Sequence, residues 1–365
     1  MSKLRVGVLF GGRSGEHEVS LVSAAAILAG LNRSKYDVVP IGISRRGEWR
    51  LGRGNWAPAA VLSRGREMCW PPEPRTRRGG QGGQPPPLDV VFPVLHGPWG
   101  EDGTVQGFLE LAGVPYVGAG VLGSAAAMDK DVMKRLFLQA GLPSVAYERV
   151  DRHVWQASPR QVTAKLERRL RYPLFVKPAN LGSSVGISKV HERAELGPAM
   201  DLAASFDTKV VVEQGIEARE FECSVLGNEF PEASLAGEVI PGQEFYSYEA
   251  KYLDAGSRTL IPAPISARLN KRIQAAAVAA FQAVECRGLA RVDFFVDKGT
   301  GELYVNEINT MPGFTPISMY PKLWAASGVP FPALLDRLIG LALDWSRKQP
   351  GGHWPAAAPA KSMVK

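Results

Sequence analysis

The sequence predicts a protein that combines an α/β domain with α+β domains, and three observations support this prediction. The chain has 365 residues, 45% of them hydrophobic, which is enough for two or three domains with buried cores. Its first part alternates strands with helices, as α/β domains do. Its later part instead contains strands joined by glycine-containing turns.

The first domain is expected to span residues 1–122 and to contain two strand–loop–helix units. The apolar run LRVGVLF predicts the first strand, and a glycine-containing loop leads from it into a helix. The second unit repeats this pattern with HGPWGEDG as its loop. The predicted elements are a strand at 4–10, a loop at 11–19, a helix at 20–31, strands at 36–43 and 88–95, and a helix at 104–112.

Two segments are expected to lie outside the packed structure. Residues 71–87, PPEPRTRRGGQGGQPPP, cannot sustain a helix or a central strand, because proline and glycine disrupt both. They predict an exposed, flexible insertion within the first domain. Residues 348–365 are expected to form a disordered tail.

Further domains are expected at residues 123–208 and 209–347. A helix at 129–140, followed by denser strand and glycine signals, indicates the first of them, and a strand at 209–214 opens the second. Within the second, apolar residues recur at helical spacing after the capping residue Ser266, which predicts a helix to about Arg287.

The charge distribution is compatible with a polyanion, but a small anionic ligand such as ATP explains it equally well. The net charge is +7, yet the lysines and arginines are dispersed along the chain. The opening MSKLRVGVLFGG has too few consecutive apolar residues for a signal peptide or a membrane span. Cys69, Cys223 and Cys286 lack the spacing of a zinc site or a disulfide framework. We expect a cytoplasmic enzyme without a nucleic-acid partner and without membrane insertion.

Residues 290–309, ARVDFFVDKGTGELYVNEIN, predict a β-hairpin. Symmetric pairing about its turn sets Asp293 opposite Glu307 and Arg291 opposite Asn309. Two carboxylates paired in this way destabilise a sheet unless a positive charge lies between them. Their oxygen ligands favour Mg²⁺ over zinc. A solvent-facing charged pair, or a one-residue bulge that separates the two carboxylates, remains an alternative.

Residues 173–190, PLFVKPANLGSSVGISKV, place Lys177 at the end of a strand and before a loop of small residues. Gly182 and Gly186 allow the backbone to approach an anion closely, and Ser183 and Ser184 can donate to phosphate oxygens. The lysine precedes the loop and a strand follows it, so the segment is not a Walker loop. The alternative interpretation is an ordinary turn.

Three other features suggest a site. The loop GGRSGEHEVS leads into a helix N-terminus and lacks the GxGxxG spacing, and its Glu16 suits a substrate ammonium group. His96 follows a strand, where open α/β sheets bind ligands. Residues 242–258 have the composition of a lid. A solvated glutamate, a structural histidine and an inert loop are the corresponding alternatives.

In this order, the segments resemble the D-alanine–D-alanine ligases of the ATP-grasp superfamily, over nearly the whole chain from Arg5 to about Leu343. The resemblance implies a pre-ATP-grasp, Rossmann-like N-terminal domain followed by a two-lobed ATP-grasp fold. It also implies ATP, D-alanine, two Mg²⁺ ions that Mn²⁺ can replace, and a homodimer. The alternative of a nicotinamide oxidoreductase does not explain the 173–190 loop. A non-catalytic sensor of the same fold would be expected to have lost a metal-binding residue or a phosphate-binding lysine, and none is missing from this sequence.

The resemblance also implies roles for individual residues. The implied ATP-binding residues are Lys130, Lys177, Ser184, Glu213, Gln214, Ile216 and Glu220, and the implied metal ligands are Asp293, Glu307 and Asn309. The implied catalytic residues are Glu16, Ser183, Tyr252, Arg291 and Gly313, and the implied substrate-binding residues are His96, Lys251 and Ser318. Ligases that accept D-lactate often carry a histidine near Tyr252; residues 242–258 contain EAKY and no histidine, which favours D-alanine.

Overall fold

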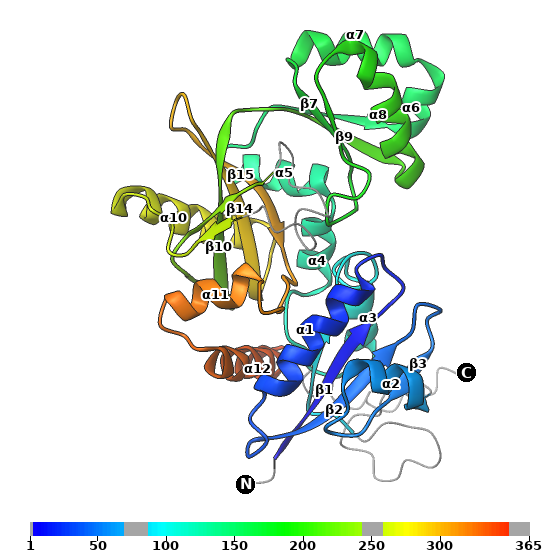
Figure 1. Ribbon diagram of the computed structural model, residues 1–365, viewed down its shortest axis with the longest axis vertical. Coiled ribbons are helices and arrows are strands. Elements are labelled where there is room, and N and C mark those ends of the chain that lie inside the picture. The colour runs from blue at the N-terminus through cyan, green and yellow to red at the C-terminus, as the bar shows by residue number, and fades with distance from the viewer. Residues whose placement is uncertain (1–2, 69–86, 243–257, 350–365) are drawn as a thin grey trace, which may run out of the picture.

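The structure, a computed structural model, describes residues 3–68, 87–242 and 258–349 and contains three β-sheets (Figure 1). The predicted insertion at 71–87, apart from Pro87, most of the predicted lid and nearly all of the predicted tail fall outside these residues. The chain alternates helices and strands through its first part and becomes richer in antiparallel strands later. This architecture confirms the predicted α/β and α+β fold class.

The first sheet has five strands in the order β4-β3-β2-β1-β5. Strand β1 pairs in parallel with both β2 and β5, so the loops that follow β1 and β5 leave the sheet at the same edge. The strands are β1 (Leu4–Gly11), β2 (Tyr36–Ile43), β3 (Trp49–Leu51), β4 (Arg66–Glu67) and β5 (Val90–Val94). Its helices are α1 (His17–Gly30), α2 (Pro58–Arg64) and α3 (Thr104–Leu111). Helix α1 begins three residues before the predicted Ser20.

The second sheet has four strands in the order β6-β9-β7-β8, all antiparallel, and lies at the far end of the molecule from the first sheet (Figure 1). We call this sheet and its helices the central lobe. Its strands are β6 (Tyr147–Asp151), β7 (Leu174–Pro178), β8 (Ser188–Val190) and β9 (Lys209–Gln214). Its helices are α6 (Arg152–Ala157), α7 (Pro159–Arg169) and α8 (Arg193–Phe206).

Strand β9 corrects the predicted boundary at residue 209. It pairs with both β6 and β7, so it is an interior strand of the central lobe rather than the start of the third domain. Val210, Val211 and Val212 are all fully buried there. Such a continuous apolar run is typical of a strand covered on both faces, but it does not say which strands flank it.

The third sheet follows the order β13-β12-β10-β14-β15, with β11 paired to β10. Its strands are β10 (Ala218–Gly227), β11 (Glu232–Ala233), β12 (Gly237–Ile240), β13 (Arg258–Leu260), β14 (Gly288–Asp297) and β15 (Leu303–Asn309). The remaining helices are α4 (Val121–Met128), α5 (Lys130–Gln139), α10 (Ala267–Ala283), α11 (Met319–Ala326) and α12 (Phe331–Lys348). Helix α10 ends four residues before the predicted Arg287, after Ser266 caps it through Leu269 N.

Helices α4 and α5 also depart from the predicted division. They were expected in the domain at 123–208, but Met133 and Phe137 are buried in the same core as Phe281 of α10 and Val292 of β14. The amphipathic pattern of α5 predicts that one face is buried without identifying the sheet that buries it. The predicted boundary at 123 therefore separates these helices from the sheet against which they pack.

The first and third sheets share one hydrophobic core. Val8 and Phe92 of the first sheet, Leu289 of β14 and Leu335 of α12 all belong to it. We call these two sheets and their helices the fused half. The backbone is tight at this junction: a Cβ added to Gly288, which has φ +75°, would lie 3.1 Å from the Gly118 nitrogen. The junction therefore fixes the first sheet against the third.

Among the described residues, no single helix is both long and apolar enough to cross a membrane. Helices α11 and α12 pass such a test only as a pair, and the chain bends by 105° between them. Leu323, Leu334 and Leu338, on these helices, are fully buried in the protein.

Candidate active site

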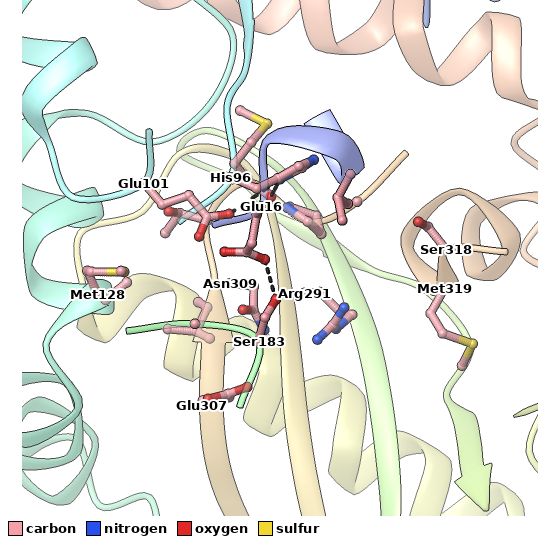
Figure 2. A pocket seen from close by; sticks show the side chains of 18 of the residues that line it. Glu16, His96, Glu101, Met128, Ser183, Arg291, Glu307, Asn309, Ser318 and Met319 are labelled. Carbon is pink, nitrogen blue, oxygen red and sulfur yellow. Dashed lines mark hydrogen bonds and ion pairs between the residues drawn. The ribbon is translucent and has the colours of Figure 1, made fainter. Parts of the chain in front are cut away.

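One pocket lies where the first sheet, the central lobe and the third sheet meet (Figure 2). The loops after β1 and β5 line one side, the loop after β7 closes another, and strands β14 and β15 form the floor together with the loop that follows β15. Nine of the predicted site residues line it: Glu16, His96, Lys130, Ser183, Arg291, Glu307, Asn309, Gly313 and Ser318.

Glu16 connects the two sides of this pocket. The Ser183 hydroxyl, from the loop after β7, donates a short hydrogen bond to the Glu16 carboxylate, as Figure 2 shows. Two glycines leave room for that carboxylate: an added Cβ would lie 2.6 Å from Glu16 Oε2 at Gly97 and 3.2 Å from it at Gly182. The contact brings together two segments that are 167 residues apart in the sequence.

The loop after β7 has the backbone of an anion-binding loop. Ser183 and Ser184 have φ values of 49° and 59°, and Gly186 has 72°, so three residues in four adopt left-handed conformations. Successive backbone N–H groups in such turns can point toward a common concavity. Strain of this kind in non-glycine residues is common at ligand sites.

His96 is a buried histidine held by three groups. Its Nε2 lies 3.1 Å from Ser23 Oγ, and its Nδ1 lies 3.0 Å from the Met311 carbonyl oxygen and 3.7 Å from Glu101 Oε1. Burial alone would lower the pKa of His96, but the carboxylates of Glu101 and Glu16 outweigh it and raise the pKa. Burial raises the pKa of Glu101 as well. Both shifts favour the protonated forms at this wall of the pocket.

The hairpin register matches the prediction at the pocket. Arg291 pairs with Asn309 and Asp293 with Glu307, as symmetric pairing requires. A one-residue shift follows between Asp293 and Phe294, where Phe294 pairs with Val305. The bulge therefore lies beyond the two carboxylates and does not separate them.

A third carboxylate extends this row. Glu222 of β10 pairs with Asp293 on the other side of β14, so Glu222, Asp293 and Glu307 cross three adjacent strands. Arg291 balances part of the charge: its Nε and Nη2 donate to Asp293 at 2.7 Å each, and its Nε lies 3.0 Å from Glu222. Burial would lower the pKa of Arg291, but Asp293 and Glu222 raise it instead.

The chemistry of this row suits a hard cation. Asp293, Glu307 and Asn309 offer carboxylate and amide oxygens, the ligands that Mg²⁺ prefers. Asp293 currently accepts hydrogen bonds from Arg291 and, at 3.2 Å, from Asn309 Nδ2. Within the described parts of the chain, no three acidic, histidine or cysteine residues converge as a ready metal site. Nucleotide phosphates would therefore have to complete the coordination of an ion bound here.

The lysines of the predicted nucleotide site lie at the junction between the central lobe and the third sheet. Lys130 Nζ donates to the Leu181 carbonyl oxygen at 2.5 Å and so reaches the loop after β7. Lys177 Nζ donates to Glu213 Oε2 at 2.6 Å, between neighbouring strands β7 and β9. Glu213 is buried, which would raise its pKa, but the charges of Lys134 and Lys177 lower the pKa to about 2.

Several predicted residues do not line the pocket. Gln214 is one of them, and its Oε1 accepts a hydrogen bond from Arg171 N at 3.1 Å. Lys251 and Tyr252 lie outside the described residues. The other predicted residues that do not line the pocket are Lys177, Ser184, Glu213, Ile216, Glu220 and Asp293.

Gly313 and Ser318 lie close together in the pocket lining, and Figure 2 shows Ser318 across the pocket from Glu307. Ser318 Oγ accepts a hydrogen bond from Thr315 N at 3.0 Å, and it would lie 2.6 Å from a Cβ at Gly313. Ser318 also precedes helix α11, whose N-terminus favours an anion. This wall can therefore receive a negatively charged group.

The sequence analysis missed Glu101, Lys134 and Glu222. Glu101 and Glu222 line the pocket, and Lys134 forms an ion pair with Glu213. Lys134 had a detectable signal, since it lies four residues after Lys130 and hence on the same helix face. Glu222 alternates with Glu220 on one strand, but only the pairing of β10 with β14 identifies it as a neighbour of Asp293.

Two family models match the chain. The model described as D-ala D-ala ligase N-terminus matches residues 5–119, and the model described as D-ala D-ala ligase C-terminus matches residues 136–340. Curated relatives match nearly the whole chain. A D-alanine–D-alanine ligase from Solibacter usitatus is 54% identical over 95% of this chain and 98% of the relative. One from Natranaerobius thermophilus is 49% identical over 94% of this chain and 96% of the relative.

Solved structures give the same result. A D-alanine-D-alanine ligase from Coxiella burnetii superposes with a TM-score of 0.83 at 39% identity, covering 96% of each chain. The VanG D-Ala:D-Ser ligase from Enterococcus faecalis also superposes with a TM-score of 0.83 at 39% identity, covering 93% of this chain and all of the other.

Proposed function

This chain belongs to the D-alanine–D-alanine ligase family, and from that premise we propose how its pocket carries out the reaction. The enzyme is an ATP-dependent ligase that joins two D-alanine molecules into the dipeptide used in peptidoglycan synthesis. One observation carries the assignment of the site. The hydrogen bond between Glu16 and Ser183 joins the loop after β1 to the anion-binding loop after β7, inside a pocket that Arg291 and Glu307 also line.

The reaction begins with phosphorylation of the first D-alanine. A carboxylate is a poor electrophile, so its attack on the γ-phosphate of ATP forms an acyl phosphate with a good leaving group. The amine of the second D-alanine then attacks the acyl carbon, and ADP, phosphate and the dipeptide leave. Water must be excluded, because it would hydrolyse the acyl phosphate. Residues 242–258, as a lid, would serve this purpose.

The nucleotide would lie between the central lobe and the third sheet. Lys130 and Lys177 would neutralise phosphate charge, and Ser184 would donate to a phosphate oxygen from the loop after β7. The residues proposed to surround the adenine and ribose are Glu213, Gln214, Ile216 and Glu220.

Asp293, Glu307 and Asn309 would hold two Mg²⁺ ions, which Mn²⁺ can replace, together with the ATP phosphates. Bound there, the ions would neutralise charge on the transferring phosphoryl group. The row of carboxylates across β10, β14 and β15 supports this proposal, because three acidic side chains meet on adjacent strands there.

The substrate roles are those that the family resemblance implies, and charge and position support them for the described residues. Glu16 suits the ammonium group of the first D-alanine, and Ser183 and Tyr252 would complete a hydrogen-bonded set with it. His96 lies beside Glu16 in the same wall and would contact that substrate. Ser318 and Lys251 would receive the carboxylate of the second D-alanine.

Arg291 and the Gly313 amide are the proposed donors to the tetrahedral oxyanion. Both line the pocket, on the floor and on the turn after β15. Donors fixed in advance at the position of a developing charge stabilise a transition state by several kcal/mol, of the order of 3–4 kcal/mol per donor.

We also propose that the enzyme works in the cytoplasm as a homodimer. ATP is available in that compartment, and the family resemblance is the basis for the dimer. Sedimentation of the purified chain would test it: a monomer at micromolar concentration would contradict the dimer and leave the proposed chemistry intact.

The second substrate has two serious alternatives to D-alanine. One structural relative is named a D-Ala:D-Ser ligase and is as similar to this chain as the D-alanine ligase from Coxiella burnetii. D-lactate is the other, although the absence of histidine from residues 242–258 disfavours it. The acceptor is therefore the part of the proposal that most needs direct measurement.

The test is phosphate release from ATP and Mg²⁺, with products identified by mass spectrometry. D-Alanine alone, L-alanine alone, and D-alanine with D-serine or D-lactate are compared. We expect release that requires D-alanine and yields D-alanyl-D-alanine even when the other acceptors are present. A mixed product in preference to the dipeptide would reassign the acceptor, and no release with any pair would refute the ligase assignment.

A further inference from the structure

We propose that Lys134 is a positioning residue that couples the nucleotide-binding edge of the central lobe to the metal-binding end of the β14–β15 hairpin. This inference rests on the proposed function, because it assumes that ATP and Mg²⁺ bind at those two places. Lys134 itself lies outside the pocket lining and has no role in the assignments above.

The first observation is the burial of its charge. The Lys134 side chain is 1% exposed and that of Glu213 is 3% exposed, and their charged atoms lie 3.2 Å apart. Isolated lysines are almost never this deeply buried, since removing an ammonium group from water is costly. The buried ammonium group of Lys134 therefore depends on specific polar partners.

The second observation is that this ion pair joins two bodies. Lys134 lies on α5, whose Met133 and Phe137 are buried in the core of the third sheet. Glu213 lies on β9 of the central lobe, where its other carboxylate oxygen accepts a hydrogen bond from Lys177. Lys134 thus fixes the Glu213–Lys177 pair from outside the lobe that contains it.

The third observation is a contact with the bulge in the hairpin. Lys134 Nζ lies 3.4 Å from the carbonyl oxygen of Asn306. Asn306 is the extra residue of the bulge, because Asp293 pairs with Glu307 while Phe294 pairs with Val305. The carbonyl of a bulged residue lies outside the regular ladder, so a cation beside it helps to fix the local backbone.

The residue after that bulge is Glu307, a proposed metal ligand. A bulge reorients the side chains next to it, and bulges are common beside active sites for this reason. The ammonium group of Lys134 therefore contacts two groups: the Glu213 carboxylate on the nucleotide side, at 3.2 Å, and the Asn306 carbonyl oxygen, at 3.4 Å. The backbone at Asn306 in turn sets the direction of the Glu307 side chain. One side chain controls both halves of the ATP–metal site.

Helix α5 is itself held firmly at its N-terminus. Asp129 caps it by accepting hydrogen bonds from Asp131 N and Val132 N, and Lys209 Nζ donates to Asp129 at 2.6 Å. Lys130, one turn before Lys134, reaches the loop after β7. Lys130 and Lys134 lie on one face of α5 and contact the loop after β7 and strand β9 of the central lobe, respectively. Only Lys130 lines the pocket.

The test compares Lys134→Met with Lys165→Met. Methionine keeps most of the lysine side-chain volume and removes the charge. Lys165 is a matched control in the central lobe, because it forms an ion pair of 2.8 Å with Glu148 but is 47% exposed and does not line the pocket. ATP binding is measured by isothermal titration calorimetry over a series of Mg²⁺ concentrations, and KM for D-alanine is measured at saturating ATP and Mg²⁺.

We expect Lys134→Met to weaken ATP binding by about tenfold, the effect of losing one charge-assisted contact, and to raise several-fold the Mg²⁺ concentration needed for half-maximal ATP binding. Lys165→Met should match the wild type in both. KM for the first D-alanine should change less than about twofold, because the Glu16 side of the pocket is untouched.

A lower melting temperature with wild-type ATP affinity and Mg²⁺ requirement would mean that Lys134 is merely structural and would overturn the proposal. If Lys134→Met does not fold, Lys134→Gln decides instead, because it removes the charge but can still donate a hydrogen bond to the Asn306 carbonyl oxygen: weaker ATP binding supports the proposal, and wild-type ATP affinity and Mg²⁺ requirement overturn it. Failure of the wild-type protein to bind ATP would refute the proposed function rather than the role of Lys134.

Discussion

The fused half and the central lobe are built differently, although both border the same pocket. In the fused half, one core joins the two sheets, from Val8 of β1 through Phe314 to Leu335 of α12, and further cores cover their other faces. The central lobe has a separate core, in which Leu166, Val176 and Met200 are fully buried, and its helices and strands make their main contacts with one another. Figure 1 shows the lobe standing apart from the rest of the molecule.

The contacts between these two bodies are largely polar. Ser183 bonds to Glu16, Lys134 pairs with Glu213, and Lys209 pairs with Asp129. Polar contacts can be exchanged for contacts with water or a ligand at little net cost, whereas an apolar core cannot be opened in that way. The two bodies are therefore joined by specific polar contacts, whereas the fused half is joined across its two sheets by apolar packing.

The largest expected effect would come from breaking each core separately. Phe314 lies edge-on to Phe92, with ring centroids 5.6 Å apart, and is 1% exposed. Phe314→Ala should destabilise the fused half by about 3–5 kcal/mol, and Leu166→Ala should destabilise only the central lobe, by about 2–5 kcal/mol. In scanning calorimetry, the two variants should shift different transitions. A shift of the same single transition by both would show that the bodies are not independent.

A smaller effect on stability but a clear one on activity is expected from Ser183→Ala. The variant removes the hydroxyl that bonds to Glu16 and leaves both cores intact. Stability should change by less than about 1 kcal/mol, while kcat/KM for D-alanine should fall about tenfold or more. The exposed Ser205, whose hydroxyl donates to the nearby Leu202 carbonyl oxygen at 2.7 Å, offers Ser205→Ala as the control. Equal kinetics for the two variants would exclude a catalytic role for the Ser183–Glu16 contact.

The smallest effect should appear as a pH dependence. Because Lys134 and Lys177 lower the pKa of Glu213 to about 2 in the folded protein, against 4.5 ordinarily, ionised Glu213 stabilises the fold at any pH above about 4.5. That contribution is lost as pH falls from 4.5 toward 2. The stability difference between wild type and Glu213→Gln, from urea unfolding followed by circular dichroism, should be constant from pH 8 to 5 and shrink below 4.5. A difference that grows in acid would contradict this sign.

The sequence predicted best what depends on local pairing. Symmetric pairing about a short turn set Asp293 against Glu307 and Arg291 against Asn309, and both pairs are observed. The bulge lies between these pairs and the turn. No residue type in the sequence VNEI, residues 305–308, predicts a bulge at that point. Local pattern also located the strand–loop–helix units of the first sheet, since alternating apolar runs and glycine turns determine them directly.

What the sequence did not predict depends on contacts between distant segments. The apolar run at 209–214 indicates a strand equally well in the central lobe or in the third sheet, and pairing with β6 and β7 decides between them. Helix α5 likewise shows an apolar face without showing which core receives it. Glu222 and Lys134 became recognisable only after these pairings were known, because their significance comes from neighbours on other elements.

Native-state hydrogen exchange under increasing denaturant tests the two-body account most directly, because it gives an opening free energy for each group of amides. The account predicts that amides of β1 in the first sheet and β14 in the third share one opening free energy, and that amides of β7 and β9 in the central lobe share a different one. A single opening free energy for all three sheets, or separate openings of β1 and β14, would contradict it.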